Sequence, residues 1–355
     1  MSRVIKTGLV GYGMAAQVMH APFLYTSPQY EVVTVLERHR EASKALFPAV
    51  QVARTLEELL ATDVELVVIT TPNETHVPYT LQALAAGKHV VLEKPFTVTS
   101  ADAQLLIDAA KKADRVLSVF HNRRYVADFL TMRQVLQQQL LGDVHEFEAH
   151  YDRYRPDPKP NAWREENIPG SGVLYDLGPH LIDQALCLFG LPKHIYADIR
   201  KQRPHSVVDD YFELQLDYGF TKVVLKAGML VREPGARYVI HGTAGSFIKY
   251  GEDPQEAILK TGQLPTASDW GSEPMDAYGL LHTTVNGKEF KDKYPSLRGN
   301  FGLYYQHLHD TLVNGKPLCE RPEHGFNTIR LIELAQESSR LKAAVACGGL
   351  KDVAY

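Results

Sequence analysis

Short, continuous apolar runs alternate with helical patterns through the first 122 residues. The runs are rich in Val, Leu and Ile and lie at 4–11, 30–37, 64–72, 89–95 and 115–122. Strands that are buried on both faces carry such runs, because helices cover both sides of a parallel sheet. We therefore predict an α/β Rossmann doubly wound domain over residues 1–122.

The pattern changes after Asn122. Apolar and polar residues alternate in several later segments, at 144–155, 194–203, 209–219 and 221–230. Alternation is typical of an antiparallel sheet with one covered and one open face. Residues 251–300 are rich in Gly, Pro, Asp and Lys and are expected to form long loops. We predict that residues 123–355 form an α+β domain with a mostly antiparallel, open-faced sheet, for substrate binding and oligomerisation.

Composition excludes several classes of protein. The net charge of −4 gives no reason to expect binding to nucleic acid or to a membrane. The three cysteines, Cys187, Cys319 and Cys347, are far apart, so we expect thiols in a reducing compartment rather than disulfides or a zinc site. The chain enters a strand pattern at once and has no run of 18 apolar residues. We expect a cytoplasmic protein without a bound metal.

A glycine-rich turn follows the first apolar run. Gly11, Gly13 and Ala16 form a G-x-G-x-x-A pattern between a predicted strand and a predicted helix. Gly11 allows a tight turn, Gly13 lets the backbone approach a diphosphate, and Ala16 permits close packing of helix on strand. A purely structural turn is the alternative. We predict dinucleotide binding by the turn as a whole: Gly11, Tyr12, Gly13, Met14, Ala15 and Ala16.

The second apolar run ends in Glu37-Arg38, about 20 residues after the turn, where a ribose-reading residue is expected. A carboxylate at Glu37 favours NAD by accepting from the ribose 2′-hydroxyl. Arg38, with Arg40, favours NADP by pairing with a 2′-phosphate. A third interpretation is that both charges are solvated at a strand end.

The ends of the later strands supply further candidates. Ligands of open α/β sheets bind beyond the carboxyl ends of the strands. Lys94 ends one strand, and Pro95 biases its backbone towards an extended conformation. A lysine there donates to a reacting oxygen and favours negative charge on it. The predicted cofactor neighbours at this edge are Thr71, Pro72, Asn73, His76, Glu93, Lys94 and Asn122, although His76 also fits as the first residue of a helix.

A helical segment of the second domain carries Asp176, His180 and Asp183, whose spacing places them near one face. A carboxylate beside an imidazole fixes its tautomer, and the histidine serves as acid or base. The alternative is structural: the aspartate caps the helix, and the histidine is a core residue whose hydrogen bonds are made within the protein. Because a helix tolerates proline in its first turn, Pro179 favours a helix that begins later than residue 173.

The sequence resembles the Gfo/Idh/MocA oxidoreductase family, most closely its NADP-dependent scyllo-inositol dehydrogenase branch. Three motifs carry the resemblance: the G-x-G-x-x-A pattern at residues 11–16, E-K-P at residues 93–95 and D-x-x-x-H at residues 176–180. The resemblance implies that Lys94, Asp176 and His180 form the catalytic group, with either Lys94 or His180 as the base. The implied reaction is NAD(P)-dependent oxidation of a secondary alcohol on a cyclitol or sugar. Implied substrate contacts are Arg123, Arg124, Tyr154, Trp163, Arg164, Asp176 and His180.

The resemblance leaves choices open. NADP is slightly preferred, although relatives tend to carry Ser-Arg where this chain has Glu37-Arg38. The alternative activities are an NAD-assisted glycosidase and a non-catalytic dinucleotide-binding regulator. The open sheet face, together with the resemblance, predicts a homodimer or homotetramer.

Overall fold

The computed structural model describes residues 3–160 and 162–355, which divide into two compact units. Unit 1 comprises Met1–Tyr125, Pro254–Trp270 and Asn300–Phe326, and unit 2 comprises Val126–Asp253, Gly271–Gly299 and Asn327–Tyr355. The units therefore interleave along the chain, whereas the sequence suggested one boundary near residue 122. One reason for the interleaving is that the segment Asn300–Phe326 contributes to the core of unit 1, where the Tyr304 hydroxyl lies 2.7 Å from the Ser118 hydroxyl.

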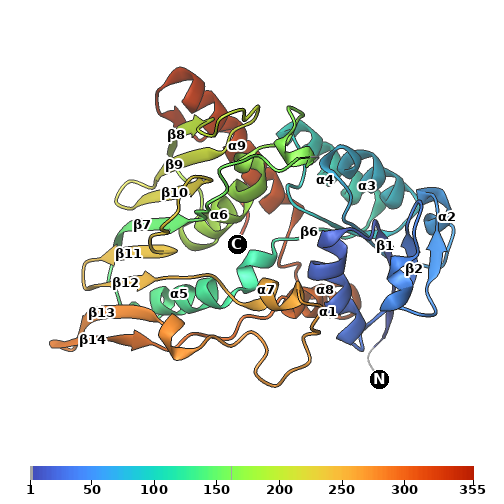
Figure 1. Ribbon diagram of the computed structural model, residues 1–355, viewed down its shortest axis with the longest axis horizontal. Coiled ribbons are helices and arrows are strands. Elements are labelled where there is room, and N and C mark those ends of the chain that lie inside the picture. The colour runs from blue at the N-terminus through green and yellow to red at the C-terminus, as the bar shows by residue number, and fades with distance from the viewer. Residues whose placement is uncertain (1–2, 161) are drawn as a thin grey trace. The chain divides into compact units, whose positions relative to one another are not determined.

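Unit 1 contains a six-stranded parallel sheet in the order β3-β2-β1-β4-β5-β6 (Figure 1). The strands are β1 (Ile5–Val10), β2 (Tyr30–Leu36), β3 (Gln51–Ala53), β4 (Leu66–Ile69), β5 (His89–Leu92) and β6 (Leu117–Val119). All four side chains of β4 are fully buried, as expected for a strand covered on both faces. The predicted Rossmann fold is confirmed. The short β3 was not among the predicted runs.

The helical elements of unit 1 begin and end where the sequence provides caps. In α2 (Leu56–Leu60), the Thr55 hydroxyl accepts from the Glu58 amide at 3.2 Å and so caps the start of the helix. In α4 (Ser100–Ala113), Thr99 accepts from the Asp102 amide in the same way. The remaining elements are η1 (Ala16–His20, a π-helical turn), α1 (Ala21–Thr26), η2 (Ala42–Ala45), η3 (Asn73–Thr75), α3 (His76–Ala85), η4 (Asn122–Tyr125), α7 (Gln255–Leu259) and α8 (Gly302–Asn314).

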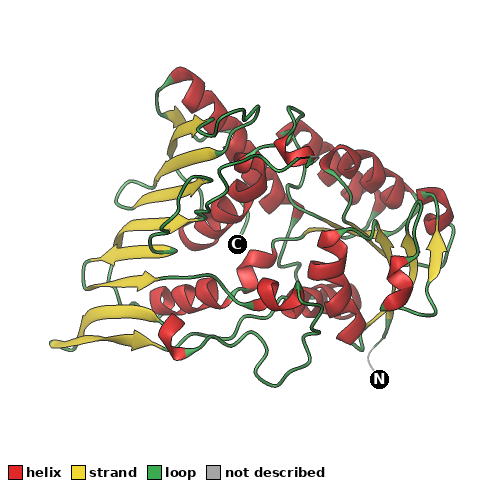
Figure 2. Ribbon diagram, viewed as in Figure 1, coloured by secondary structure: helices red, strands yellow, loops and turns green. Residues whose placement is uncertain are grey.

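Unit 2 is built on a nine-stranded sheet in the order β14-β13-β12-β11-β7-β10-β9-β8-β15 (Figure 2). Its first strands are β7 (Val144–His150), β8 (His194–Arg200), β9 (Tyr211–Asp217), β10 (Lys222–Gly228), β11 (Tyr238–Gly242) and β12 (Gly245–Lys249), and its last is the short edge strand β15 (Val345–Ala346). β7 and β10 pair in parallel, and the other neighbours pair antiparallel. The predicted mostly antiparallel sheet is confirmed.

One face of this sheet is covered by helices. The helices of unit 2 include α5 (Ala127–Gln137), α6 (Val173–Phe189) and most of α9 (Pro322–Leu341), and α5 and α6 lie on the same side of the strands in Figure 1. Along β7, Phe147 and Ala149 are fully buried, whereas Glu146 and Glu148, which alternate with them, are partly exposed. This alternation reflects one face packed on the core and one face left to solvent.

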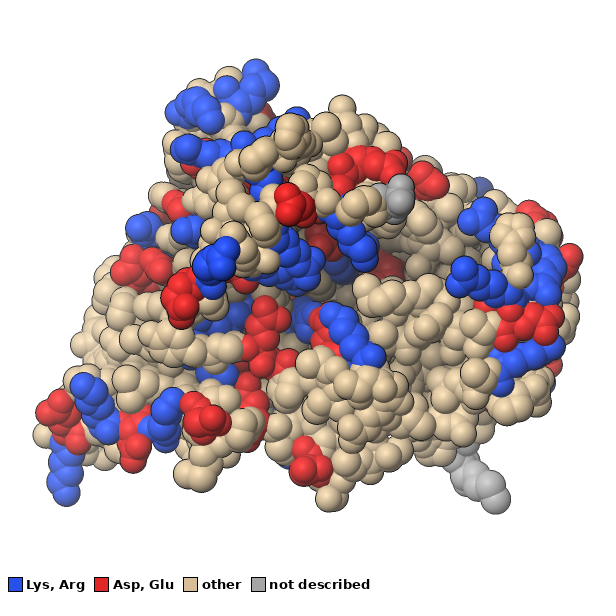
Figure 3. All heavy atoms as spheres, in the orientation of Figure 1, with Lys and Arg blue, Asp and Glu red and all other residues tan. Residues whose placement is uncertain are grey.

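Residues 251–300 differ from expectation. Instead of long loops throughout, they contain a hairpin of β13 (Gly279–Val285) and β14 (Lys288–Tyr294). Asn286 and Gly287 have φ angles of 53° and 75°, as a two-residue hairpin turn requires. β14 is an edge strand and exposes charges of both signs (Figure 3), which explains why it carries no apolar pattern.

The expectation for Pro179 was wrong. α6 begins at Val173, six residues before Pro179, and continues through the proline to Phe189. Asp209 stabilises its first turn, because the Val173 amide donates to the Asp209 carbonyl and the Leu174 amide donates to its carboxylate at 2.7 Å. Gly172 has a φ of 87°, and a Cβ there would lie 2.2 Å from the Asp209 carboxylate. This capped, buried start supports a helix that has lost one internal hydrogen bond to proline.

Candidate active site

The glycine turn after β1 has the geometry of a dinucleotide cradle. Gly11 has a φ of 90°, and a Cβ there would approach the Thr71 side chain to 2.9 Å. At Gly13 a Cβ would meet nothing within 4 Å, so the space beside this backbone is open. Ala16 is fully buried. A diphosphate approaching the backbone at Gly13 fits this arrangement.

Hydrogen bonds hold the turn to the neighbouring strands. The Gly11 amide donates to the Leu36 carbonyl at the end of β2, at 3.2 Å. The Thr70 hydroxyl, just after β4, donates to the Val10 and Gly11 carbonyls. The turn is therefore fixed before any ligand arrives, while the side chain of Met14 is 56% exposed.

Glu37 points into the protein rather than to solvent. Its carboxylate is buried and accepts hydrogen bonds from the amides of Ala42 and Ser43, both at 2.9 Å. Arg54 donates to the backbone carbonyls of Glu37 and Arg40 and so closes the same loop. A solvated Glu37, one of the interpretations of the sequence, is therefore wrong. Arg38 is exposed next to it.

The carboxyl ends of β1, β4 and β5 lie along one edge of the sheet, because these strands are neighbours and parallel. This arrangement brings the glycine turn, Thr71–Asn73 and Lys94 to the same edge. Lys94 is half-buried, and its backbone amide donates to the Glu93 carboxylate. His76 is the first residue of α3, as one interpretation expected, and its ring lies between the carbonyls of Thr71 and Pro95.

The next segment, η4, is tied to other parts of unit 1. The side-chain amide of Asn122 lies 3.8 Å from the Met19 sulfur. Arg123 forms an ion pair with Glu256. Burial raises the pKa of Glu256, but Arg123 and Lys260 outweigh it and bring that pKa to about 2. The Arg124 guanidinium donates to the Cys319 carbonyl. Substrate binding by Arg123 and Arg124 stays a prediction.

In unit 2 the structure brings three of the predicted residues together at the start of α6. The Arg164 guanidinium lies 3.1 Å from the Asp176 carboxylate and 4.5 Å from the centre of the Trp163 ring. The Gly172 amide donates to the Arg164 carbonyl, which folds the turn η5 (Trp163–Glu165) against the helix. Asp176 and His180 lie one helical turn apart on α6.

The turn η5 has a support that sequence reasoning missed. Arg203 is buried and donates to the carboxylates of both Glu165 and Asp210. No spacing signal links Arg203 to Glu165, since they are 38 residues apart.

Tyr154, another predicted substrate contact, lies under Arg232, which donates to its hydroxyl at 2.6 Å. Substrate binding by Tyr154 stays a prediction.

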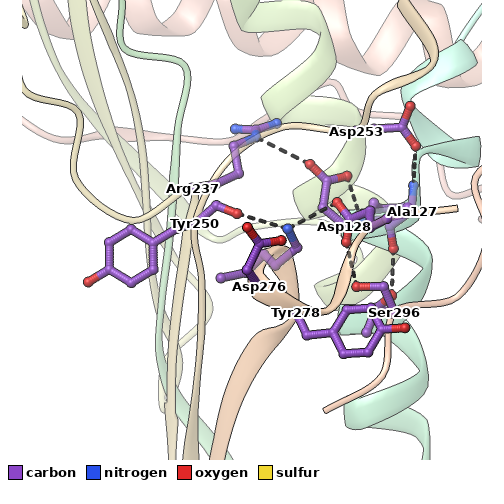
Figure 4. A network of polar contacts seen from close by, with 12 residues as sticks. Ala127, Asp128, Arg237, Tyr250, Asp253, Asp276, Tyr278 and Ser296 are labelled. Carbon is purple, nitrogen blue, oxygen red and sulfur yellow. Dashed lines mark hydrogen bonds and ion pairs between the residues drawn. The ribbon is translucent and has the colours of Figure 1, made fainter. Parts of the chain in front are cut away.

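A buried charge network in unit 2 includes Arg237 and Asp128 (Figure 4). His180 is buried, and its ring packs edge-on against Tyr151, with 6.3 Å between the centres of the two rings. The guanidinium of Arg237 lies 3.5 Å from the centre of the Tyr151 ring and 3.8 Å from the Asp128 carboxylate. Burial raises the pKa of Asp128 to about 6, although Arg237 opposes the shift. Tyr151, which packs on His180, therefore also packs on the arginine of a buried ion pair.

Within residues 3–160 and 162–355, no helix is long and apolar enough to cross a membrane. Across the same residues, no group of three or more His, Cys, Asp or Glu side chains is placed to hold a metal ion.

Comparison with known proteins identifies the fold and the family. Residues 5–121 match the model of the Gfo/Idh/MocA oxidoreductase family, NAD-binding Rossmann fold, and residues 133–346 match its C-terminal alpha/beta domain. The chain is 40% identical to scyllo-inositol 2-dehydrogenase (NADP(+)) IolW of Bacillus subtilis, over 96% of this chain and 95% of that protein. It is 42% identical to the uncharacterized oxidoreductase YdgJ of Escherichia coli, over 97% and 99%.

A solved structure agrees with this similarity. The oxidoreductase yvaA from Bacillus subtilis superimposes with a TM-score of 0.94 at 39% identity, covering 98% of this chain and 99% of that one. The glycine turn, the parallel sheet and the mostly antiparallel second sheet are thus found together in a chain matched almost from end to end. The protein belongs to the Gfo/Idh/MocA family and is an oxidoreductase with an NAD(P)-binding Rossmann domain.

Proposed function

We propose that this protein is an NADP-dependent dehydrogenase that reversibly oxidises a ring secondary alcohol of a cyclitol or sugar to the ketone. The observation that carries the proposal is the position of Lys94, half-buried at the carboxyl end of β5 on the same sheet edge as the glycine turn. The substrate class rests on the similarity to the scyllo-inositol dehydrogenase of Bacillus subtilis. The first substrate to test is therefore scyllo-inositol.

The chemistry assigns a task to each group. Bound nicotinamide supplies the hydride acceptor. The amides of the Gly11–Ala16 turn would hold the diphosphate, since the space beside Gly13 is open. Lys94 would donate a hydrogen bond to the alcohol oxygen and favour negative charge on it. His180 would exchange the hydroxyl proton, with Asp176 to orient substrate and imidazole. Lys94 and His180 can exchange the roles of base and donor.

The test of the function is a substrate panel. Inositol stereoisomers and aldoses are incubated with NADP⁺ or NAD⁺, and the absorbance of the reduced nicotinamide is followed. We expect reduction of NADP⁺ with at least one cyclitol. Cleavage of aryl glycosides without net reduction would instead favour the glycosidase alternative. Binding of NADPH with neither activity would favour the regulator.

The orientation of Glu37 supports the proposed preference for NADP. A carboxylate facing the ribose would repel a 2′-phosphate, but this one is engaged by two backbone amides of its own loop. Arg38 is exposed directly after it and carries the donors that a 2′-phosphate prefers. We propose that Glu37 shapes the loop and that Arg38 reads the phosphate.

Replacing Arg38 by alanine is expected to lower the ratio of kcat/KM for NADP⁺ to that for NAD⁺ by about 10- to 100-fold, because charge-assisted hydrogen bonds to the phosphate are lost. The effect should fall on NADP⁺ alone. Lys112→Ala, which removes an exposed positive charge from the last turn of α4, is the control and should leave the ratio unchanged. A ratio unaltered by Arg38→Ala would exclude Arg38 as the phosphate reader.

We also propose that the outer face of the unit 2 sheet mediates a homodimer or homotetramer. Val239, Ile248 and Leu280 lie side by side on adjacent strands and are all partly exposed, which makes an apolar row. A second copy of the chain would cover this row with the same face. Ile248→Glu should yield monomers in sedimentation velocity at micromolar concentration, and a monomeric parent chain would contradict the proposal.

A cytoplasmic location is proposed on the basis of the three cysteines, Cys187, Cys319 and Cys347, which lie far apart in the sequence as expected in a reducing compartment. Cell fractionation tests it.

A further inference from the structure

A buried series of hydrogen-bonded side chains, Tyr305, His20 and Glu93, ends at the backbone amide of Lys94. Glu93 receives the Lys94 amide on one carboxylate oxygen, at 3.0 Å, and faces the Nε2 atom of His20 with the other, at 2.9 Å. The Nδ1 atom of His20 lies 2.6 Å from the Tyr305 hydroxyl. His20 is fully buried, and Tyr305 and Glu93 are nearly so. Phe120 covers the imidazole, with ring centres 4.0 Å apart.

The chemistry of these groups determines which atom donates each hydrogen bond. A carboxylate only accepts, so the Nε2 atom of His20 carries the proton and donates to Glu93. The Nδ1 atom of a neutral imidazole then accepts from the Tyr305 hydroxyl. Burial raises the pKa of Glu93, but His20 and Lys94 outweigh it and leave that pKa lowered. An ionised Glu93 thus has fixed donors on both oxygens and little freedom to turn.

A second buried histidine holds the other end of the same segment. The Nδ1 atom of His76 lies 2.9 Å from the Pro95 carbonyl, and its Nε2 atom lies 3.1 Å from the Thr71 carbonyl at the end of β4. His76 is 1% exposed. A neutral imidazole donates to one of these carbonyls at a time. The segment Glu93–Pro95 is therefore fixed from η1 on one side and from α3 on the other.

Neither histidine belongs to a catalytic sequence motif, and the side chains of both are almost completely buried. Their common feature is that each binds a residue directly adjacent to Lys94. A lysine that donates to a reacting oxygen must hold its ammonium within a fraction of an ångström of the productive position. Its side chain is long and flexible, so much of that precision has to come from the backbone that carries it.

We propose that His20, acting through Glu93, is a positioning residue for Lys94, and that His76 completes the clamp through Pro95. The proposal rests on the proposed function of Lys94. His20 would not touch substrate or cofactor. Its removal would leave Lys94 present and charged but no longer held in place, so the loss should appear in kcat.

The experiment compares four variants of the full chain. His20→Leu removes both hydrogen bonds, whereas His20→Gln keeps an N–H donor for Glu93. His309→Leu is the matched control, since His309 is a buried, hydrogen-bonded histidine of unit 1 that contacts Gln29 and the Arg3 carbonyl. Tyr305→Phe removes a single hydroxyl from the chain and serves if His20→Leu does not fold.

We expect His20→Leu to lower kcat by about 10- to 100-fold while the Kd for NADPH stays within twofold. His20→Gln should recover most of the loss, and His309→Leu should lower thermal stability but leave kcat unchanged. Tyr305→Phe should lower kcat less than His20→Leu. Equal losses of kcat in His20→Leu and His309→Leu, or none in His20→Leu, would overturn the proposal.

A measurement without substrate separates this proposal from the proposed function. Lysines are reductively methylated with ¹³C-formaldehyde, and the resonance missing from Lys94→Arg is assigned to Lys94. We expect that resonance to shift or broaden in His20→Leu and to return in His20→Gln. An unchanged resonance would refute positioning by His20, whereas a shifted resonance in a protein inactive on every polyol would refute only the proposed function.

Discussion

Replacing Lys94 by methionine is expected to lower kcat for polyol oxidation by about 10²- to 10⁴-fold, the usual contribution of a group that donates to or exchanges protons with a reacting oxygen. Methionine keeps the length of the side chain and removes the charge. Lys94 is half-buried and its backbone is fixed by Glu93. The fold and the glycine turn should therefore persist, and the Kd for NADPH, from quenching of protein fluorescence, should change by a small factor.

Two comparisons make this result specific. Lys112→Met removes a lysine from the last turn of α4 and should leave kcat unchanged. Lys94→Arg keeps a positive charge with a different shape and should recover part of the activity. If Lys94→Met oxidised polyols within a factor of a few of the parent chain, Lys94 would not be catalytic, and the helix carrying His180 and Asp176 would have to supply the acid–base chemistry alone.

The parallel sheet was predictable because its signals are local. Each strand is a short apolar run, and the glycine turn follows the first of them directly. The position of Lys94 just beyond a strand was also predictable, because an apolar run that ends in a lysine and a proline marks a strand end. The hairpin of β13 and β14 had a local signal too, in Asn286-Gly287, but the polar composition of β14 hid the strands on either side of it.

The orientation of Glu37 could not be predicted. Its position identified it as a ribose-reading candidate, yet its carboxylate binds amides five and six residues further along the chain. That outcome depends on how the loop closes, and Arg54, 17 residues away, takes part by binding the Glu37 carbonyl. A strand-end carboxylate has the same sequence signature whether it faces a cofactor or caps its own loop.

Long-range polar contacts were equally hidden. His20 and Glu93 are 73 residues apart, and His20 and Tyr305 are 285 apart. Neither pair has a spacing rule, because contact between them depends on the packing of whole elements. The interleaved units have the same origin, since Tyr304 and Tyr305 fill space beside Phe120 that the first 125 residues leave open.

The second large effect concerns stability. Asp128→Asn is expected to stabilise the protein at pH 7.5 relative to the parent chain, by on the order of 3 kcal/mol at most, and to have a smaller effect, about a third of that, near pH 4.5. Burial raises the pKa of Asp128 from 3.8 to about 6 in the folded state. The stability contributed by its proton is fully present below the unfolded pKa and is lost as the pH rises through about 6. Asparagine mimics the protonated form at every pH.

The measurement is the difference in thermal midpoint between variant and parent across pH 4.5 to 8. Other titrating groups affect both proteins alike and cancel in the difference, which should rise towards pH 6 and then level off. The Phe129 amide donates to the Asp128 carboxylate at 2.7 Å, and the asparagine carbonyl can replace that acceptor. Asp143→Asn, at an exposed position in unit 2, should give a flat difference. A flat difference for Asp128→Asn would mean that Arg237 fully compensates the buried Asp128 carboxylate, and that this carboxyl does not titrate between pH 4.5 and 8.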